Sequence, residues 1–346
     1  MPLAPFFERL SAGQHLSIEE AHASMCVLLT GRASPPDIAA FLLALKNKGE
    51  TEIELAGFVR AMREHMTRVE VGDDLSSRTI DIVGTGGDAG GTFNISTVTA
   101  FVLAGAGAYV AKHGNRAISG KAGSADVLAA LGIRIAMTPQ EAAQAVREFG
   151  LGFLFAPYLH PAFKHVQAVR RELKVRTVFN LLGPLANPAS VQRQVIGAPS
   201  PQFAEIMANA LGILGTIRSF VVSGGVSGSS SELDEISTAG PTEVWEVRNN
   251  KVVRHRWMPS DFGLGLTNLS QLAGGDAAEN AVIARAILEG RTGPHRDIVL
   301  ANAAVGLVAA GLAGSIGEGM ALAKEAIDSK KALAVLKNLQ KSFPAN

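Results

Sequence analysis

The fold of this chain is decided by the stretch Ile80-Asp81-Ile82-Val83-Gly84-Thr85-Gly86-Gly87-Asp88-Ala89-Gly90-Gly91-Thr92-Phe93-Asn94-Ile95-Ser96-Thr97, which runs from an apolar strand through five glycines into a helix start. Glycines permit positive φ and close approach of the backbone to a ligand. The N–H groups of such a loop and of the following helical turn can point at an anion. The polar side chains behind the glycines either cap the helix or reach a phosphate. The stretch therefore predicts a phosphate-binding loop at the end of a strand.

Two common nucleotide-binding motifs fit this loop less well. Gly84, Gly86 and Ala89 have the spacing of the dinucleotide fingerprint, which requires a carboxylate at the end of the next strand. The next predicted strand, residues 108–111, ends instead in the cationic segment Lys112-His113-Gly114-Asn115-Arg116. No Walker Lys-Ser or Lys-Thr pair follows the glycines either. A nicotinamide-dependent oxidoreductase and a P-loop nucleotidase are therefore disfavoured.

Charged segments elsewhere in the chain indicate which anion the loop binds. The basic segment at residues 112–116, followed by Ser119-Gly120-Lys121-Ala122-Gly123-Ser124, offers donors for several phosphates. Farther along, Glu232-Leu233-Asp234-Glu235 supplies carboxylates, which are hard oxygen ligands suited to magnesium. A site with both signs of charge fits a magnesium-bound polyphosphate better than a bare anion.

Distinctive motifs follow one another over nearly the whole length of the chain: Gly84-Thr85-Gly86-Gly87-Asp88, Asn94-Ile95-Ser96-Thr97, Lys112-His113-Gly114-Asn115-Arg116, Gly123-Ser124-Ala125-Asp126, Phe155-Ala156-Pro157 with His160-Pro161, Val169-Arg170-Arg171-Glu172-Leu173, Arg176-Thr177-Val178-Phe179-Asn180-Leu181-Leu182-Gly183-Pro184-Leu185 and Leu233-Asp234-Glu235-Ile236-Ser237. In these motifs and in their order the chain resembles the anthranilate phosphoribosyltransferase family.

The resemblance implies a reaction in tryptophan biosynthesis, in which the amino group of anthranilate displaces pyrophosphate from C1 of phosphoribosyl pyrophosphate (PRPP). Such a reaction needs no nucleophilic side chain, because the aryl amine is already deprotonated at neutral pH. Catalysis is expected to come from positioning and from charge stabilisation. The resemblance implies Mg²⁺ as the cofactor and transition-state stabilisation by Lys112 and Asn115.

Binding roles also follow from the resemblance, residue by residue. It implies PRPP contacts from Gly84, Gly87, Asp88, Thr92, Asn94, Ile95, Ser96, Thr97, Lys112, His113, Gly114, Asn115, Arg116, Ala117, Ile118, Ser119, Gly120 and Ser124. It implies anthranilate contacts from Gly84, Asn115 and Arg170, with His113, His160, Gly183 and Pro184 as pocket walls. It implies magnesium ligands Ser96, Asp234 and Glu235. The planar guanidinium of Arg170 suits the two oxygens of the anthranilate carboxylate.

The pattern of elements predicts an α/β fold. The first 70 residues show helical patterns only, with capping boxes at Ser17 with Glu20 and at Thr51 with Glu54. A further helix is expected to begin at Ser34-Pro35-Pro36 and to end at Gly49. From residue 79 onward short β runs alternate with helices, which predicts a mostly parallel central sheet flanked by helices. The predicted strands are residues 79–83, 108–111, 195–196, 220–222 and 243–247, and a hairpin-like Asn249-Asn250 follows the last of them. The resemblance implies a small all-helical domain, residues 1–72, joined by roughly residues 165–183. The larger α/β domain, residues 73–346, then binds PRPP, with the site in the cleft between the two.

Bulk properties limit the possible partners. The net charge is +1, from 32 basic and 31 acidic residues, so nothing drives the chain toward nucleic acid or a membrane surface. The only cysteine, Cys26, is expected to be a buried small hydrophobe. The N-terminus shows no signal peptide, and the longest apolar stretch, residues 98–111, is shorter than the roughly 20 residues of a membrane helix. We expect a cytoplasmic protein that forms a homodimer through its helical domain.

Two alternative functions remain open. A class II pyrimidine nucleoside phosphorylase has a similar fold, but it would not need the motifs around Arg170 and residues 180–184. A non-catalytic relative that binds nucleic acid would show a basic face and would tolerate loss of Asp234 and Glu235. Residues 223–232 form a longer segment than is usual in the family, so we expect this loop to be mobile until substrate binds.

Overall fold

A mostly parallel sheet forms the centre of the molecule. The computed structural model describes residues 3–86, 91–117 and 121–345. The eight strands have the order β3-β2-β1-β4-β5-β7-β8, and β6 pairs with β5. Strands β1 to β5 are parallel, whereas β6, β7 and β8 are antiparallel to their partners, which confirms the predicted sheet. The strands are β1 (Thr79–Gly84), β2 (Tyr109–Gly114), β3 (Leu151–Phe155), β4 (Arg193–Gly197), β5 (Arg218–Gly225), β6 (Glu232–Leu233), β7 (Thr242–Arg248) and β8 (Lys251–Trp257).

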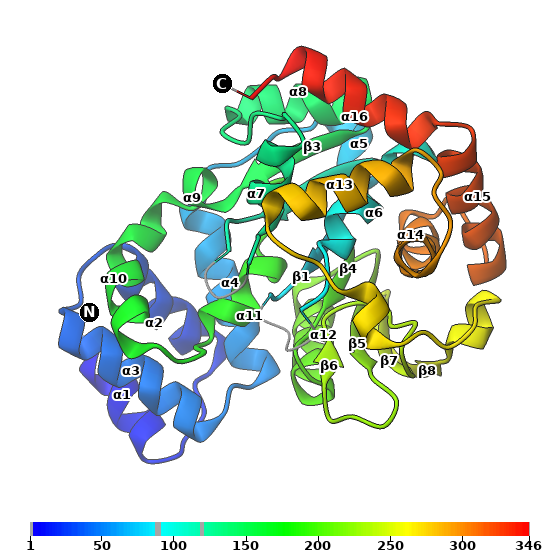
Figure 1. Cartoon of the computed structure of the whole chain (residues 1–346). Helices are drawn as coiled ribbons and strands as arrows, with labels where there is room; N and C mark the ends of the chain where they lie inside the picture. The colour runs from blue at the N-terminus through cyan, green and yellow to red at the C-terminus, as the bar shows by residue number, and fades with distance from the viewer. Residues whose placement is uncertain (1–2, 87–90, 118–120, 346) are drawn as a thin grey trace.

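Helices flank the sheet on both faces (Figure 1). They are α1 (Ala4–Ser11), α2 (Ile18–Leu29), α3 (Pro35–Lys48), α4 (Glu52–His65), α5 (Asp73–Ser76), α6 (Ile95–Gly105), α7 (Ser124–Ala130), α8 (Pro139–Phe149), α9 (Ala156–Leu159), α10 (Lys164–Leu173), α11 (Phe179–Leu185), α12 (Pro201–Leu214), α13 (Ala277–Leu288), α14 (Pro294–Ala310), α15 (Ile316–Asp328) and α16 (Lys331–Ser342). Short 3₁₀ turns lie at η1 (Pro161–Phe163), η2 (Pro259–Phe262) and η3 (Leu269–Leu272).

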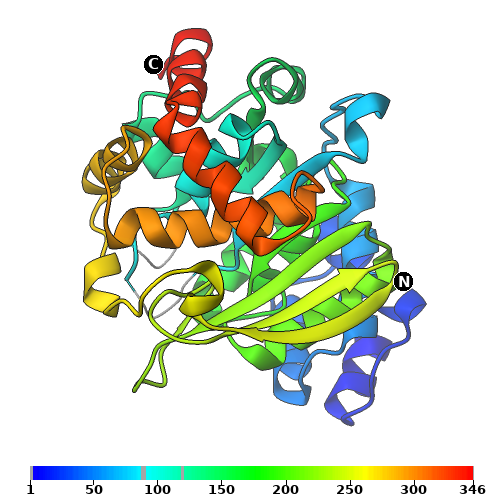
Figure 2. The ribbon, with the colours of Figure 1, turned by 90° about the vertical axis from the view of Figure 1, so that its right-hand side faces the viewer.

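Alternating side chains of the strands enter two separate cores. On β5, Phe220 and Val222 join one core and Val221 joins the other, because successive strand residues point to opposite faces. The first core contains residues of α6, α8 and α13 to α16, and the second contains residues of α1 to α4 and α10 to α12. In Figure 2 the orange and red helices α14 to α16 lie on one side of the yellow strands and the blue N-terminal helices on the other. A domain boundary at residue 72 stays a prediction.

The predicted helix starts are confirmed. Both capping boxes form, with the Ser17 hydroxyl accepting from Glu20 N and the Thr51 hydroxyl accepting from Glu54 N. Ser34 caps α3 in the same way, and this helix ends at Gly49, whose φ of 89° favours glycine. Local sequence therefore fixes where these helices begin and end.

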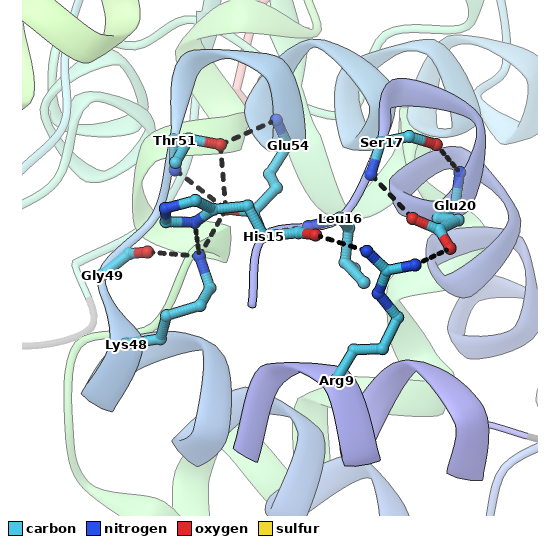
Figure 3. A network of polar contacts seen from close by, with 9 residues as sticks. All are labelled: Arg9, His15, Leu16, Ser17, Glu20, Lys48, Gly49, Thr51 and Glu54. Carbon is cyan, nitrogen blue, oxygen red and sulfur yellow. Dashed lines mark hydrogen bonds and ion pairs between the residues drawn. The ribbon is translucent and has the colours of Figure 1, made fainter. Parts of the chain in front are cut away.

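Glu54 lies at the centre of a buried polar network among the N-terminal helices (Figure 3). Its side chain is 0% exposed and that of its ion-pair partner Lys48 is 3% exposed. Its carboxylate accepts hydrogen bonds from Lys48 Nζ at 2.8 Å, from Leu16 N at 3.0 Å and from Thr51 N at 2.9 Å. These bonds join the chain before α2 to the end of α3 and the start of α4. A buried charge is tolerated only when it is paired and hydrogen-bonded in this way.

Three features differ from the predictions. Strand β2 continues to Gly114, so Lys112 and His113 belong to the sheet and not to a loop. Strand β3 has no counterpart among the predicted strands, because its short apolar run is equally typical of a buried helix segment. Cys26 is half-buried and not fully buried. Within the described ranges, no helix combines the length and the apolar character that crossing a membrane requires.

Candidate active site

Glycines at three strand ends make room for the acidic segment. Gly84 at the end of β1 is the register partner of Gly197 at the end of β4. A Cβ atom on Gly84 would collide with Oδ2 of Asp234, and one on Gly197 would collide with the Asp234 carbonyl oxygen. A Cβ on Gly224 of β5 would collide with the carbonyl oxygen of Glu235. The segment 234–235 can cross the carboxyl ends of these parallel strands only because glycines at the strand ends have no Cβ atoms in its way.

Both predicted metal-ligand carboxylates bind backbone N–H groups of the phosphate loop. Asp234 Oδ2 accepts from Gly86 N at 2.7 Å, and Glu235 Oε1 accepts from Ser96 N at 3.0 Å, in the first turn of α6. Both residues are 8% exposed. Burial raises the pKa of Asp234, against the lowering effect of the Gly86 N–H. The carboxylates of Asp234 and Glu235 and the hydroxyl of Ser96 are hard oxygen donors, so the donor set fits magnesium.

Lys112 is buried between the sheet and α6. Its Nζ donates to Ile82 O at 2.7 Å and to Ser96 Oγ at 3.2 Å. Burial lowers the pKa of Lys112, while the charges of Asp81, Glu235 and Asp234 act in the opposite direction. The side chain thus places a cation beside the predicted magnesium ligands, where a polyphosphate would meet both.

Asp81 and Asn187 hold the strand that carries Lys112. The Asp81 carboxylate accepts from His113 N at 3.1 Å and from Asn187 Nδ2 at 2.8 Å. The same amide group also donates to Ala111 O at 2.8 Å. Burial raises the pKa of Asp81 to about 6, against the opposing effect of Lys112. Neither residue was among the predicted site residues, because the contacts join β1 to a segment more than a hundred residues away.

Asn94 is oriented by a residue that the sequence gives no reason to select. Its Nδ2 donates to Ala122 O at 3.1 Å, and its Oδ1 accepts from Nδ2 of Asn280 on α13 at 2.9 Å. Among the neighbouring predicted residues, the side chains of Ile95 and Thr97 are each 1% exposed and face the core. Any substrate contact from these two residues would therefore involve the backbone.

The basic segment after β2 is folded by Asp126. Its carboxylate accepts from Arg116 Nη1 at 2.7 Å and from the backbone N–H groups of Ala117 and Gly123, each at 3.0 Å. Asn115 is exposed, and its carbonyl oxygen accepts from Ser124 Oγ at 3.3 Å. Arg116 is therefore engaged with a carboxylate. The predicted residues Gly87, Asp88, Ile118, Ser119 and Gly120 lie outside the described residues.

An aromatic row leads from His113 on β2, next to Lys112, to Arg170. The ring centroids of His113 and His160 are 5.1 Å apart, His160 stacks on Phe163 at 5.2 Å, and Phe163 meets Phe179 edge-on at 5.4 Å. The guanidinium carbon of Arg170 lies 5.1 Å from the centroid of the Phe179 ring. Within residues 3–86, 91–117 and 121–345, Arg170 has no carboxylate partner. An uncompensated guanidinium beside an aromatic ring suits an aromatic carboxylate.

The remaining predicted wall residues lie beside this row. Nδ1 of His113 is 3.2 Å from Gly183 O, and buried Pro184 accepts a hydrogen bond at its carbonyl oxygen from Gln194 Nε2 at 2.9 Å. In the part of the chain that the structure describes, Nε2 of His113 and Nε2 of His160 are buried without a hydrogen-bond partner. Burial lowers the pKa of His113 to about 3 and that of His160 to about 4. Both rings are therefore neutral near pH 7.

These buried histidines predict that the protein loses stability in acid. Their pKa values lie below the ordinary 6.5, so the unfolded chain binds more protons between pH 6.5 and about 4, and stability falls as the pH falls through this window. Asp81 acts oppositely, because its pKa is raised from 3.8 to about 6, but the two histidine shifts together are larger. We expect the midpoint temperature of thermal unfolding to decrease when the pH is lowered from 7 to 4.5. His160→Gln should flatten this dependence, and an unchanged pH profile in that variant would refute the assignment.

Comparison with known proteins places the chain in a family. Residues 76–333 match the family described as "Glycosyl transferase family, a/b domain", and residues 4–66 match its helical bundle domain. The chain is 56% identical, over 98% of both chains, to the anthranilate phosphoribosyltransferase of Solibacter usitatus. It is similar to the crystal structure of that enzyme from Thermus thermophilus, with a TM-score of 0.89 and 43% identity over 96% of this chain and 97% of the other. The structure of the Saccharomyces cerevisiae enzyme in complex with PRPP and Mg gives a TM-score of 0.87 and 30% identity over 98% and 97% of the two chains. The chain belongs to the anthranilate phosphoribosyltransferase family.

Proposed function

We propose that this protein transfers the phosphoribosyl group of PRPP to the amino group of anthranilate, releasing pyrophosphate, in tryptophan biosynthesis. The observation that carries the proposal is that two complementary groups of residues begin at adjacent positions of β2. Lys112 meets Ser96 of the phosphate loop, to which Asp234 and Glu235 also bind, and the aromatic row runs from His113, the next residue, to Arg170. Relatives with this name match the chain over nearly its full length.

PRPP would bind at the phosphate loop. Asp234, Glu235 and Ser96 would hold Mg²⁺, which neutralises negative charge on the pyrophosphate when bound. The backbone N–H groups of Gly86 and Ser96 are suited to anions, since carboxylates already occupy them. The ammonium of Lys112 adds a fixed positive charge next to Ser96, where negative charge grows on the leaving group.

Anthranilate would lie along the aromatic row with its carboxylate at Arg170. The neutral rings of His113 and His160 would form an uncharged wall of the anthranilate pocket, so they would add no competing positive charge near the amine. The amine is neutral at pH 7 and its lone pair is free, so it would attack C1 directly as pyrophosphate leaves, and the N–H proton that the new C–N bond releases would pass to the departing pyrophosphate or to water. Orientation of the two reactants would supply a large part of the rate enhancement, about 7 kcal/mol or more.

One assay tests the proposed reaction. The full-length protein is mixed with anthranilate, PRPP and magnesium, and the loss of anthranilate fluorescence is followed. We expect fluorescence loss with all components and none when PRPP or magnesium is omitted. A correctly folded protein that consumes no anthranilate would overturn the proposal, and phosphorolysis of a pyrimidine nucleoside under the same conditions would identify the alternative enzyme class.

Arg170→Ala should weaken anthranilate binding much more than PRPP binding. The substitution removes the proposed partner of the carboxylate, and a charge-assisted hydrogen bond contributes about 1.5 to 3 kcal/mol. Calorimetry with each ligand measures the two affinities separately. Arg171→Ala is the matched control, because Arg171 is an exposed neighbour on the same helix. Equal weakening of both ligands by Arg170→Ala would indicate a structural role instead.

We propose that the protein acts in the cytoplasm as a homodimer, with the apolar surfaces of the N-terminal helices in the interface. Size-exclusion chromatography with light scattering measures the oligomeric state directly, and a monomer at working concentrations would contradict the proposed dimer.

A further inference from the structure

A cluster of three metal-ligating side chains lies on the helical part of the molecule, on elements that carry none of the proposed active-site residues. His22 and Cys26 are on α2 and Glu64 is on α4. Ligand atoms of all three residues lie within 4.8 Å of one another. His22 Nε2 is 2.9 Å from Glu64 Oε2 and 3.9 Å from Cys26 Sγ. His22 and Cys26 are half-buried, and Glu64 is exposed, so ions in solution can reach the cluster.

The packing of α2 against α4 fixes this arrangement. The two helices are in close contact at Gly57, where a Cβ atom would collide with Ile18 O and lie 2.7 Å from Ala21 Cβ. His22 and Cys26 are one turn apart and therefore share one face of α2. Glu64 follows Gly57 by about two turns on the same side of α4. The close helix contact thus holds the three ligands in place without requiring a metal for folding.

We propose that His22, Cys26 and Glu64 form a second metal site that binds Zn²⁺ or a similar borderline ion and links α2 to α4. Imidazole, thiolate and carboxylate are together typical zinc ligands, whereas magnesium prefers oxygen alone. Tetrahedral zinc with its usual bond lengths places ligand atoms about 3.5 Å apart. The observed separations of 2.9 and 3.9 Å lie on either side of this value, and all three ligand atoms lie within 4.8 Å of one another, so side-chain rotations can bring them onto one ion. Three protein ligands leave the fourth position to water.

The single cysteine makes the test unambiguous, because thiol labelling of the full-length protein reports on Cys26 alone. We expect Zn²⁺ to slow labelling by about tenfold or more, since a metal-bound thiolate is shielded from reaction. Mg²⁺ at the same concentration should have no effect. Co²⁺ should give a sulfur-to-metal charge-transfer band, which Cys26→Ser should abolish. No substrate is present in these measurements, so their outcome is independent of the proposed catalytic activity.

Matched variants separate the cluster from other zinc-binding groups. His22→Gln and Glu64→Gln should each remove most of the Zn²⁺ protection of Cys26. His65→Gln on α4 and Glu19→Gln on α2 should retain it, because these residues lie outside the cluster. Circular dichroism establishes that each variant folds. Labelling that Zn²⁺ does not slow, equal protection by Mg²⁺, or full protection in His22→Gln and Glu64→Gln would each overturn the proposal.

Discussion

Asp234→Asn combined with Glu235→Gln should bring turnover below detection at ordinary magnesium concentrations, a loss of at least about a hundredfold. The two amides keep the shape of the side chains but remove both negative charges beside the phosphate loop. Magnesium prefers anionic oxygen, so raising its concentration should restore activity only in part. The fluorescence assay with anthranilate and PRPP measures the effect.

Limited proteolysis provides a second measurement on the same variant. In the free protein we expect cleavage near residues 227–231, and magnesium with PRPP should protect this segment. The double variant should lose the protection and keep its circular dichroism spectrum. Glu232→Gln is the control, because this carboxylate lies two residues before Asp234 and makes no proposed metal contact. Full activity in the double variant, or protection without metal, would show that Asp234 and Glu235 are not the metal ligands.

Glu54→Ala should lower the free energy of unfolding by about 3 to 5 kcal/mol. The substitution leaves the ammonium of Lys48 buried without its counter-charge and removes the acceptor of Leu16 N and Thr51 N. Chemical denaturation followed by circular dichroism measures the change. If the alanine variant does not fold, Glu54→Gln tests the same charge with a side chain of nearly the same size, and it should also be strongly destabilising.

Glu20 offers a matched control for Glu54. Both residues are the third residue of their helix and close a capping box, and both pair with a basic side chain. The Glu20 side chain is 31% exposed and its partner Arg9 is 45% exposed, so Glu20→Ala should change stability by about 1 kcal/mol or less. Equal effects of the two alanine substitutions would mean that burial of the ion pair contributes little.

The sequence alone predicts features that depend on neighbours along the chain. The capping boxes, the terminating Gly49 and the hairpin at Asn249 and Asn250 follow from residue chemistry within four positions, and all are confirmed. The positive φ values of 50° and 61° at the two asparagines are those that a tight hairpin turn requires. The family is likewise identified from ordered local motifs. Backbone preferences and short hydrogen bonds are sufficient for these predictions because they do not depend on distant residues.

Features that join distant segments were decided only by the tertiary structure. The sequence suggests that Gly84 and the glycines after it serve a phosphate, whereas in the structure Gly84 together with Gly197 and Gly224 also gives the acidic segment space to cross the sheet. Nothing local to α13 marks Asn280 as the residue that orients Asn94. The two capping-box glutamates look alike in sequence, and only packing makes Glu54 a buried charge and leaves Glu20 at the surface. Burial, close backbone approach and pKa shifts arise from atoms that are far apart in the chain, so they become determined only when the sheet and its helices come together.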